Sequence, residues 1–567
     1  MRYIEGYDRK QIVLFPEKLD DLVAEDNPVR VIDEFVNQLD INELGISKTK
    51  LVQSAPGAPC YSPECLLKLY IYGYYKKVRS SRRLMELCTT NIEAMWLLER
   101  LKPDYRTIAD FRKDHKTAIK KVFKAFVRIC VELGLYNREV VVQDGSKFRA
   151  VNAKDKNVTE SKLEKKIEIA EERISKYLEE MDKNDKGEND TPEYTKEEIQ
   201  EKIRKLRERK AEYNKLIKEM KEEGITQKSF TDPESRLMLT ANGGYNVCYN
   251  VQIAVDPNSH IIGTYEVTNQ CNDMGLLTPV TTTLKEDLCV DVIEAVADKG
   301  YVHERDMLEC LLSGTIPHIP SKTEEASYEF ELEYKEAMIT QELLDSTKPE
   351  DIKACLESGV VPNAYQGKGI ETSIYEVEQY VPYEKPQTSF RLNEDGTTVT
   401  CPNGSTLNKV ARLHNKGKTR FVSRSACKNC TKRCTTSAFK QIDLKDGQTV
   451  LHTTKRQRFK KIVKSKKVIL KLTPDKGKIR NRKCVVEHPF GTMKRWQDGS
   501  YTLLMGKEKV SADIALMLLS YNIKRAINML GVRILLEKMR ERKGATMSFL
   551  QSLILLLSHS AFFLASP

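Results

Sequence analysis

Three short segments, far apart in the chain, each place one carboxylate where a strand-like run ends or a helix can begin. Asp144 follows V-V-V-Q, Asp298 follows A-V-A, and Glu487 stands in C-V-V-E-H-P-F-G-T-M-K-R-W. Three carboxylates brought together can hold two hard divalent cations. Ions about 3.5–4 Å apart would activate a nucleophile and stabilise a leaving oxygen. Together with the many Lys and Arg residues, these carboxylates predict phosphodiester chemistry on nucleic acid with Mg²⁺ or Mn²⁺. Asp144 is the best candidate to bridge the two ions, because it would lie centrally in the expected sheet.

The charge distribution favours a polyanionic partner. The chain of 567 residues has a formal net charge of +12. Between residues 455 and 483 there are fourteen Lys or Arg and one acid, Asp475. This run leads directly into Glu487, so we interpret it as a surface that contacts phosphates beside the acidic site. The alternative is a solvated loop.

Individual basic residues around Glu487 are candidates for DNA contacts. Lys494 follows Glu487 by about two helical turns and lies on a similar face. The full set of predicted DNA-binding residues is Arg480, Arg482, Lys483, Lys494 and Arg495.

Cysteine usage indicates a reducing compartment and a separate metal site. There are fourteen cysteines, most of them scattered singly, and the first residues contain no apolar signal segment. We therefore expect a cytoplasmic protein. Four cysteines are spaced C-x₂₅-C-x₂-C-x₃-C, which predicts a structural zinc site with no open coordination position. Its ligands would be Cys401, Cys427, Cys430 and Cys434. The alternatives are a module without metal, or a site in which His414 replaces Cys401.

Two further acidic positions have simpler interpretations. Asp256 precedes Pro257-Asn258, so it is expected to form the turn of a hairpin. Asn272-Asp273 is expected to cap the helix that follows it.

Hydrophobic periodicity predicts an α/β protein with several segments. The chain is expected to begin with a helical region at 1–136, which either binds DNA or acts as a scaffold. The core follows in three parts, which are a first strand at 137–157, the main part at 240–320 and a returning part with the Glu487 helix at 476–540. A helical hairpin at 158–222 and an insertion at 321–475, with the cysteine module at 401–434, separate these parts, and an apolar tail at 541–567 ends the chain. We expect the tail to pack as a terminal helix or strand, and we expect no membrane partner.

The order of the core elements predicts a mixed sheet of the RNase H-like type. A strand is followed by a hairpin, a helix, a strand, a helix and a strand, and the acids stand on the first and fourth strands. In such a sheet the first and fourth strands are neighbours, so Asp144 and Asp298 would meet.

The chain resembles the DDE transposases of bacterial insertion sequences, in the branch with an N-terminal helical domain and an RNase H-like core. The resemblance covers roughly residues 1–540 and depends on V-Q-D-G-S-K-F-R-A, G-Y-N-V-C-Y-N-V-Q-I-A-V-D, V-T-N-Q-C-N-D, A-D-K-G-Y and V-E-H-P-F-G-T-M-K-R-W, in family order. It implies that Asp144, Asp298 and Glu487 bind the metal ions. It also implies cleavage at element ends, strand transfer into double-stranded target DNA, and a homodimer on DNA.

The residues around Glu487 depart from part of the family pattern. Some related transposases have an Arg four residues before the glutamate, a Tyr upstream of that Arg, and a Lys seven residues after the glutamate. Here Lys494 matches the Lys, whereas Lys483 replaces the Arg and Arg480 occupies the Tyr position. Two other functions remain open: an RNase H-like nuclease or inactive transposase relic, and a zinc-containing DNA-binding regulator without catalysis.

Overall fold

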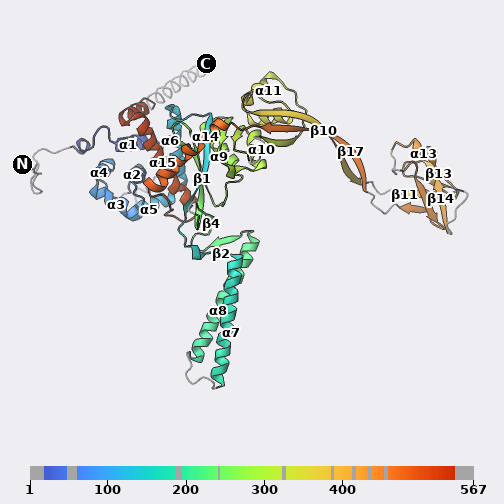
Figure 1. The fold of residues 1–567 in the computed structure, drawn as a ribbon, viewed down its shortest axis with the longest axis horizontal. Helices are drawn as coiled ribbons and strands as arrows, with labels where there is room; N and C mark the ends of the chain where they lie inside the picture. The colour runs from blue at the N-terminus through green and yellow to red at the C-terminus, as the bar shows by residue number, and fades with distance from the viewer. Residues whose placement is uncertain are drawn as a thin grey trace, which may run out of the picture.

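The computed structural model consists of a body from which two long elements project (Figure 1). The structure describes residues 18–46, 60–186, 194–240, 243–321, 327–384, 389–410, 417–431, 437–452 and 458–542. One projection is a pair of helices, and the other is a β-ribbon with a small β-module beyond its far end. Most of the predicted apolar tail lies outside the described residues. Within the described residues, no helix is long and apolar enough to cross a membrane.

A mixed sheet forms the centre of the body. Its strands run in the order β6-β5-β1-β7-β8, with β4 paired to the other end of β5. Strand β1 is antiparallel to β5 and parallel to β7, and β7 is parallel to β8. This order and these directions confirm the predicted RNase H-like core. The strands are β1 (Val140–Arg149), β4 (Arg236–Leu239), β5 (Tyr245–Val255), β6 (Ile262–Thr268), β7 (Ile293–Val296) and β8 (Thr315–His318).

Burial explains the composition of the central strands. All residues of β7 and β8 are buried, as expected for parallel strands covered on both faces. The helices that pack around this sheet are α6 (Lys116–Glu132), α9 (Leu277–Leu288), α10 (Glu304–Leu312), α14 (Lys476–Gly491) and α15 (Lys507–Leu530). Helix α15 is buried continuously from Val510 to Ile523, because it packs against α6, α2 and β6.

The N-terminal part of the chain is helical, as predicted. Its helices are α1 (Pro28–Asn37), α2 (Pro63–Tyr75), α3 (Ser81–Thr90), α4 (Ile92–Leu97) and α5 (Tyr105–Asp114), followed by α6. A Cβ on Gly73 would lie 2.2 Å from Leu84 Cδ2, so α2 and α3 approach too closely for any larger residue at this position.

A buried ionic network joins these helices to α15. Asp513, which is fully buried, lies 2.7 Å from Arg79 Nη2 and 3.5 Å from Arg112 Nη1, and Tyr74 donates its hydroxyl to the same carboxylate. Both arginine side chains are at least nine-tenths buried. The network therefore satisfies charges that would otherwise be isolated inside the protein.

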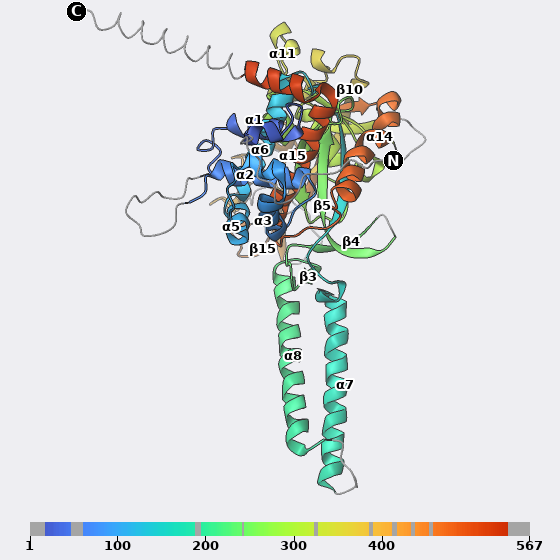
Figure 2. The same ribbon diagram turned by 90° about the vertical axis from the view of Figure 1, so that its left-hand side faces the viewer.

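The first projection is an antiparallel helical hairpin between β1 and β5 in sequence (Figure 2). It consists of α7 (Glu160–Asp185) and α8 (Lys196–Glu222), with the short strands β2 (Asn157–Thr159) and β3 (Gln227–Ser229) paired at its base. Thr195 and Glu198 form a reciprocal capping box that starts α8. The predicted hairpin insertion is therefore present.

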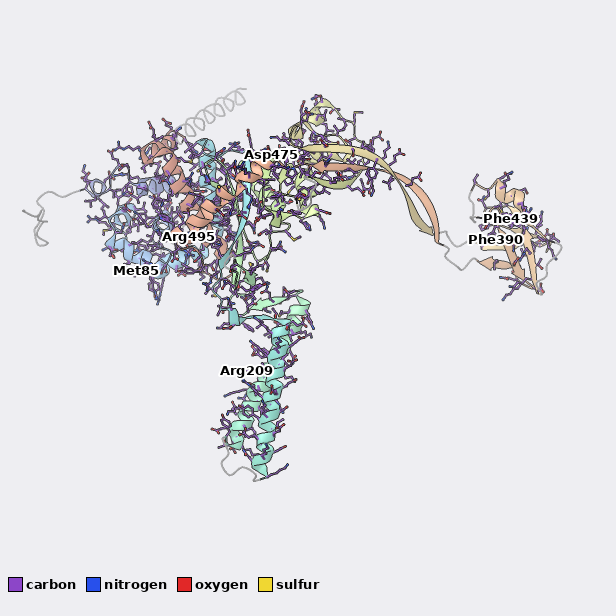
Figure 3. The ribbon with its side chains drawn as sticks, viewed as in Figure 1. Met85, Arg209, Phe390, Phe439, Asp475 and Arg495 are labelled. Atoms are coloured by element: carbon purple, nitrogen blue, oxygen red, sulfur yellow. The ribbon has the colours of Figure 1, made fainter. Side chains whose placement is uncertain are left out.

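The second projection follows β8. A three-stranded sheet in the order β10-β17-β9 leads from the body to a separate six-stranded module. The elements of this region are β9 (Tyr328–Glu333), α11 (Gln341–Asp345), α12 (Pro349–Glu357), β10 (Ile370–Glu384), β11 (Ser389–Leu392), β12 (Thr398–Thr400), β13 (Thr406–Lys409), β14 (Lys418–Val422), α13 (Arg424–Lys428), β15 (Gln441–Lys445), β16 (Val450–His452) and β17 (Arg458–Leu472). The distal module has its own small core around Phe390 (Figure 3).

The structure divides the basic run into two parts. Residues 458–472 form β17, in which Lys466 pairs with Glu376 of β10 and Lys471 pairs with Glu371. Cross-strand pairs of opposite charge stabilise a sheet, so this part of the run has acidic neighbours within the protein. Residues 455–457 lie outside the described residues, and the basic residues from Lys476 onwards lie on α14. The interpretation of 455–483 as one phosphate-contacting surface is therefore too broad.

We predict that Asp513→Asn destabilises the protein by about 3 kcal/mol, because it leaves two buried guanidinium groups without a countercharge. Thermal unfolding measures the effect. The matched control is Glu508→Gln, which removes an ion pair to Lys116 from a side chain that is 71% exposed. An Asp513→Asn protein that unfolds at the wild-type temperature would contradict the role of the network.

Candidate active site

The register of the parallel pair β1–β7 places Asp144 beside Asp298. Val142 pairs with Val296, and each aspartate stands two residues further along its strand direction. Asp298 lies two residues after the end of β7, where it caps the turn at Lys299–Tyr301 and accepts a hydrogen bond of 2.7 Å from the N–H of Gly300. Asp144 remains within β1, opposite Ile253 of β5. The two carboxylates interact electrostatically, as the shared strand positions require.

The structure adds a third acid, Asp273, to this pair. Its Oδ1 accepts hydrogen bonds of 2.7 Å from both Asn250 Nδ2 and Gln252 Nε2, and Lys147 Nζ lies 3.5 Å away. A Cβ built on Gly145 would lie 2.6 Å from the same oxygen, so glycine permits this close approach. Asp273 lies near enough to raise the pKa of Asp144.

The expected helix cap at Asn272-Asp273 is wrong. Helix α9 begins at Leu277, and its first N–H groups donate instead to Asp306, from Leu277 at 3.2 Å and from Thr278 at 3.3 Å. Asp273 is therefore free to face the sheet. The position of V-T-N-Q-C-N-D directly after β6 was the only sequence signal for its role. Asp256 does form the expected turn, because its Oδ1 accepts from the N–H groups of Asn258 and Ser259.

Burial makes the ionised form of Asp144 unfavourable. Burial, together with the negative charges of Asp298 and Asp273, raises the pKa of Asp144 to about 6, although Arg482 and the N–H of Gly145 oppose this shift. Arg482 Nη1 lies 3.6 Å from Asp144 Oδ2. This nitrogen is buried and has no hydrogen-bond partner among the described residues. The Arg482 guanidinium thus places positive charge beside the acids but offsets only part of their effect on the pKa of Asp144.

Helix α14 carries Glu487 next to the sheet. Asp475 caps the helix by accepting from the N–H groups of Gly477 and Lys478. Its own N–H donates to His318 Nδ1 at 3.0 Å, and His318 Nε2 contacts Glu294 at 2.7 Å. Burial opposes a low pKa for Glu294, but hydrogen bonds from His318, Lys368 and Lys478 hold that pKa well below its usual range. A buried carboxylate therefore ties the start of α14 to β7.

Glu487 itself is mainly in solvent. Its side chain is 64% exposed, and Lys483 Nζ lies 3.6 Å from its carboxylate. The structure thus brings together Asp144, Asp298 and Asp273, and it leaves Glu487 on the adjacent helix. Within the described parts of the chain, no group of three His, Cys, Asp or Glu residues is arranged as a metal site.

The predicted DNA-binding residues differ in their surroundings. Arg480, Lys483 and Arg495 are exposed, and Figure 3 labels Arg495 on the body. Arg482 faces Asp144 and is only 17% exposed. Lys494 donates to Ser146 Oγ at 2.5 Å and lies 4.9 Å from the ring centroid of Phe148. Lys494 is therefore held beside β1 at Ser146, which lies two residues after Asp144 on the strand.

The acidic cluster suits a hard divalent cation chemically. Its donors are carboxylate oxygens, which Mg²⁺ and Mn²⁺ prefer. Burial raises the pKa of Asp144, as do the charges of Asp298 and Asp273, so added positive charge would favour its ionised form by compensation. A bound cation would provide that compensation, with Asp144, Asp298 and Asp273 as nearby oxygen donors.

The cysteine module is described in part. Cys401 follows β12, and Cys427 lies on α13. Cys427 Sγ accepts from the N–H of Lys440 at 3.4 Å, and Asn403 Nδ2 donates to Cys430 Sγ at 3.4 Å. Cys434 and His414 lie outside the described residues. The three described cysteines do not form a metal-binding group by themselves.

We predict that Asp144→Asn stabilises the metal-free protein at neutral pH. With a folded-state pKa of about 6 against 3.8, the folded protein binds this proton more tightly than the unfolded chain. The free energy of unfolding therefore falls as the pH rises from 3.8 to about 6, and the full stability that the bound proton contributes is lost above that range. Removing the charge should recover about 1–3 kcal/mol at pH 7.5 and little near pH 4.

Thermal unfolding in the presence of a chelator at both pH values measures this difference. Asp110→Asn changes an exposed aspartate and serves as the control. An equal gain in both variants, or a gain independent of pH, would contradict the predicted burial of charge at Asp144.

Two family matches cover separate parts of the chain. Residues 17–114 match a transposase domain, DUF772, and residues 400–527 match a transposase DDE domain, which includes Glu487. No curated protein is similar enough in sequence to count as a relative. A solved piggyBac transposase synaptic complex with hairpin DNA is 9% identical, with a TM-score of 0.26 over 93% of this chain and 81% of that chain. The chain thus contains two regions that match transposase domains, and its RNase H-like sheet is consistent with a DDE transposase.

Proposed function

We propose that this protein cleaves DNA at the ends of an insertion sequence and joins the freed 3′ ends to target DNA. The observation that supports this activity most strongly is the pairing of Val142 with Val296, which brings Asp144 and Asp298 together beside the Glu487 helix. The domain matches support the same assignment.

Asp144, Asp298 and Glu487 are the proposed catalytic and metal-binding residues. Bound Mg²⁺ or Mn²⁺ ions would supply a polarised nucleophile and stabilise the leaving 3′ oxygen. Asp144 is central because it lies on the middle strand of the sheet. Glu487 would complete the set by a shift of α14 or of its own exposed side chain towards the aspartates.

The basic residues have distinct proposed roles. Arg480, Lys483, Lys494 and Arg495 would bind DNA phosphates, because they are exposed or lie beside the acidic cluster. Arg482 would first hold the charge of Asp144 and then contact a phosphate when a cation neutralises the cluster. We further propose double-stranded element ends and target DNA as partners, a homodimer on DNA, and action in the cytoplasm at the nucleoid.

One observation favours a second candidate, an RNase H-like nuclease or an inactive relic. Glu487 is 64% exposed and paired with Lys483 rather than with the aspartates. If that arrangement persists on DNA, the three predicted acids do not act together.

We predict that Asp144→Asn, Asp298→Asn and Glu487→Gln each reduce divalent-metal-dependent cleavage at least about a hundredfold, since each removes one proposed ligand from a group that acts as a unit. The substrate is labelled duplex containing the DNA that flanks the protein's own gene, and denaturing gels measure nicking and joining. Asp110→Asn is the control. Cleavage that survives Asp144→Asn would contradict the catalytic assignment, and cleavage without joining would support the nuclease.

We also propose that Cys401, Cys427, Cys430 and Cys434 bind one structural zinc ion. Donors to sulfur from Asn403 and Lys440 support this, because zinc-bound thiolates accept such hydrogen bonds. We predict about one zinc per chain by elemental analysis, and loss of that zinc in Cys430→Ser. The exposed Cys289→Ser is the control. Wild-type protein without zinc would refute the site.

A further inference from the structure

A pocket of about 310 Å³ lies between the end of α14 and α15, outside the acidic cluster. Its lining includes His488, Gly491, Trp496, Lys524 and Arg525. Trp496 ends the π-helical turn η5 (Thr492–Trp496) that follows α14. The lining contains no acidic residue.

Two ammonium groups from distant parts of the chain converge on the indole of Trp496. Lys524 Nζ lies 3.0 Å from the ring centroid, and Lys77 Nζ, from the loop after α2, lies 4.3 Å from it. Among the described residues, the charge that acts on the pKa of Lys524 is that of Lys77, not that of a carboxylate. The indole face attracts each cation, but the two ammonium groups repel each other. An anion bound in the pocket beside Lys524 would reduce that repulsion.

The rest of the lining is held in place by the core. Arg525 donates to the carbonyl of Ser259 at 3.0 and 2.8 Å, which fixes its guanidinium at the edge of the pocket. Tyr521 donates its hydroxyl to the carbonyl of His260, so His488 Nδ1, 2.8 Å from that hydroxyl, is the donor in their hydrogen bond. The His488 ring is therefore oriented before any ligand binds.

The pocket lies next to Glu487, the predicted catalytic residue of α14. His488 directly follows Glu487, and Gly491, four residues after Glu487, lies one helical turn away on the same face. A Cβ on Gly491 would meet nothing within 4 Å, so this side of the pocket is open. A DNA strand that reached Glu487 would pass this opening.

Burial, with the neighbouring charge of Lys77, lowers the pKa of Lys524, which agrees with an uncompensated basic site. The pocket adjoins the helix that carries Glu487, and its lining is basic or neutral, so a phosphate of a DNA strand bound at the acidic site can reach it. This position favours a DNA strand over a small anion.

We propose that this pocket, lined by Trp496 and Lys524 and flanked by Lys77 on the Trp496 ring, binds a backbone phosphate of the DNA strand next to the cleaved bond. This inference rests on the proposed transposase function and assigns a DNA contact to residues outside both the acidic cluster and the predicted basic set. It also gives the N-terminal helical region, through Lys77, a direct contact with DNA at the active site.

The experiment measures binding of full-length protein to labelled end duplex in Ca²⁺ across a salt series. Lys77→Ala combined with Lys524→Ala should weaken binding about tenfold or more and reduce the slope of log affinity against log salt by about 2. The matched control is Lys353→Ala, which removes an exposed lysine of α12. An unchanged affinity and slope in the double variant would overturn the proposal.

Fluorescence tests the pocket directly, because the chain has 2 tryptophans. Trp96→Phe leaves Trp496 as the reporter, and subtracting the Trp496→Phe signal from wild type gives the same information if Trp96→Phe does not fold. The duplex should change this signal at concentrations that match binding. A signal that responds to inorganic phosphate but not to duplex would refute a DNA contact.

The two proposals fail in different ways. If wild type cuts end DNA and the double lysine variant binds it normally, only the pocket assignment is wrong. If wild type neither binds nor cuts end DNA, the proposed function itself is wrong.

Discussion

The parallel pairing of β1 with β7 is the constraint on which the rest of the site depends. Strand β1 is central, and its register with β7 sets Asp144 beside Asp298. Because side chains alternate between the two faces of a strand, a one-residue slip would turn one of the two carboxylates to the opposite face. Such a slip would also turn Glu294 of β7 away from His318, Lys368 and Lys478, which pair with its buried carboxylate. Specific buried contacts therefore help to fix the geometry of the acids.

Concentrated negative charge is the cost of that geometry. Asp144, Asp298 and Asp273 lie close together, and the raised pKa of Asp144 records their repulsion and burial. Arg482 offsets part of it at 3.6 Å. A basic protein surrounds this acidic centre, so cations and DNA phosphates are both attracted to the same region. The proposed metal ions and the proposed DNA phosphates would therefore both bind in this region.

Long insertions separate the acids in sequence without disturbing the sheet. The hairpin α7–α8 leaves the body between β1 and β5, and the β-ribbon leaves it after β8 (Figures 1 and 2). Two buried ionic contacts connect separate parts of the body. Asp513 binds the N-terminal helices to α15, and Glu294 binds the start of α14 to β7. The position of Glu487 therefore depends on a contact at the base of the ribbon.

The sequence by itself determined the class of fold, the helical hairpin and the neighbouring positions of Asp144 and Asp298, because these follow from local periodicity and strand order. Only the tertiary structure decided the role of Asp273, which depends on Asn250 and Gln252 from another strand. It also turned Arg482 towards Asp144, and it paired the lysines of β17 with acids of β10. Such side-chain partners come from segments distant in sequence, so their charge environment cannot be inferred until the chain is folded.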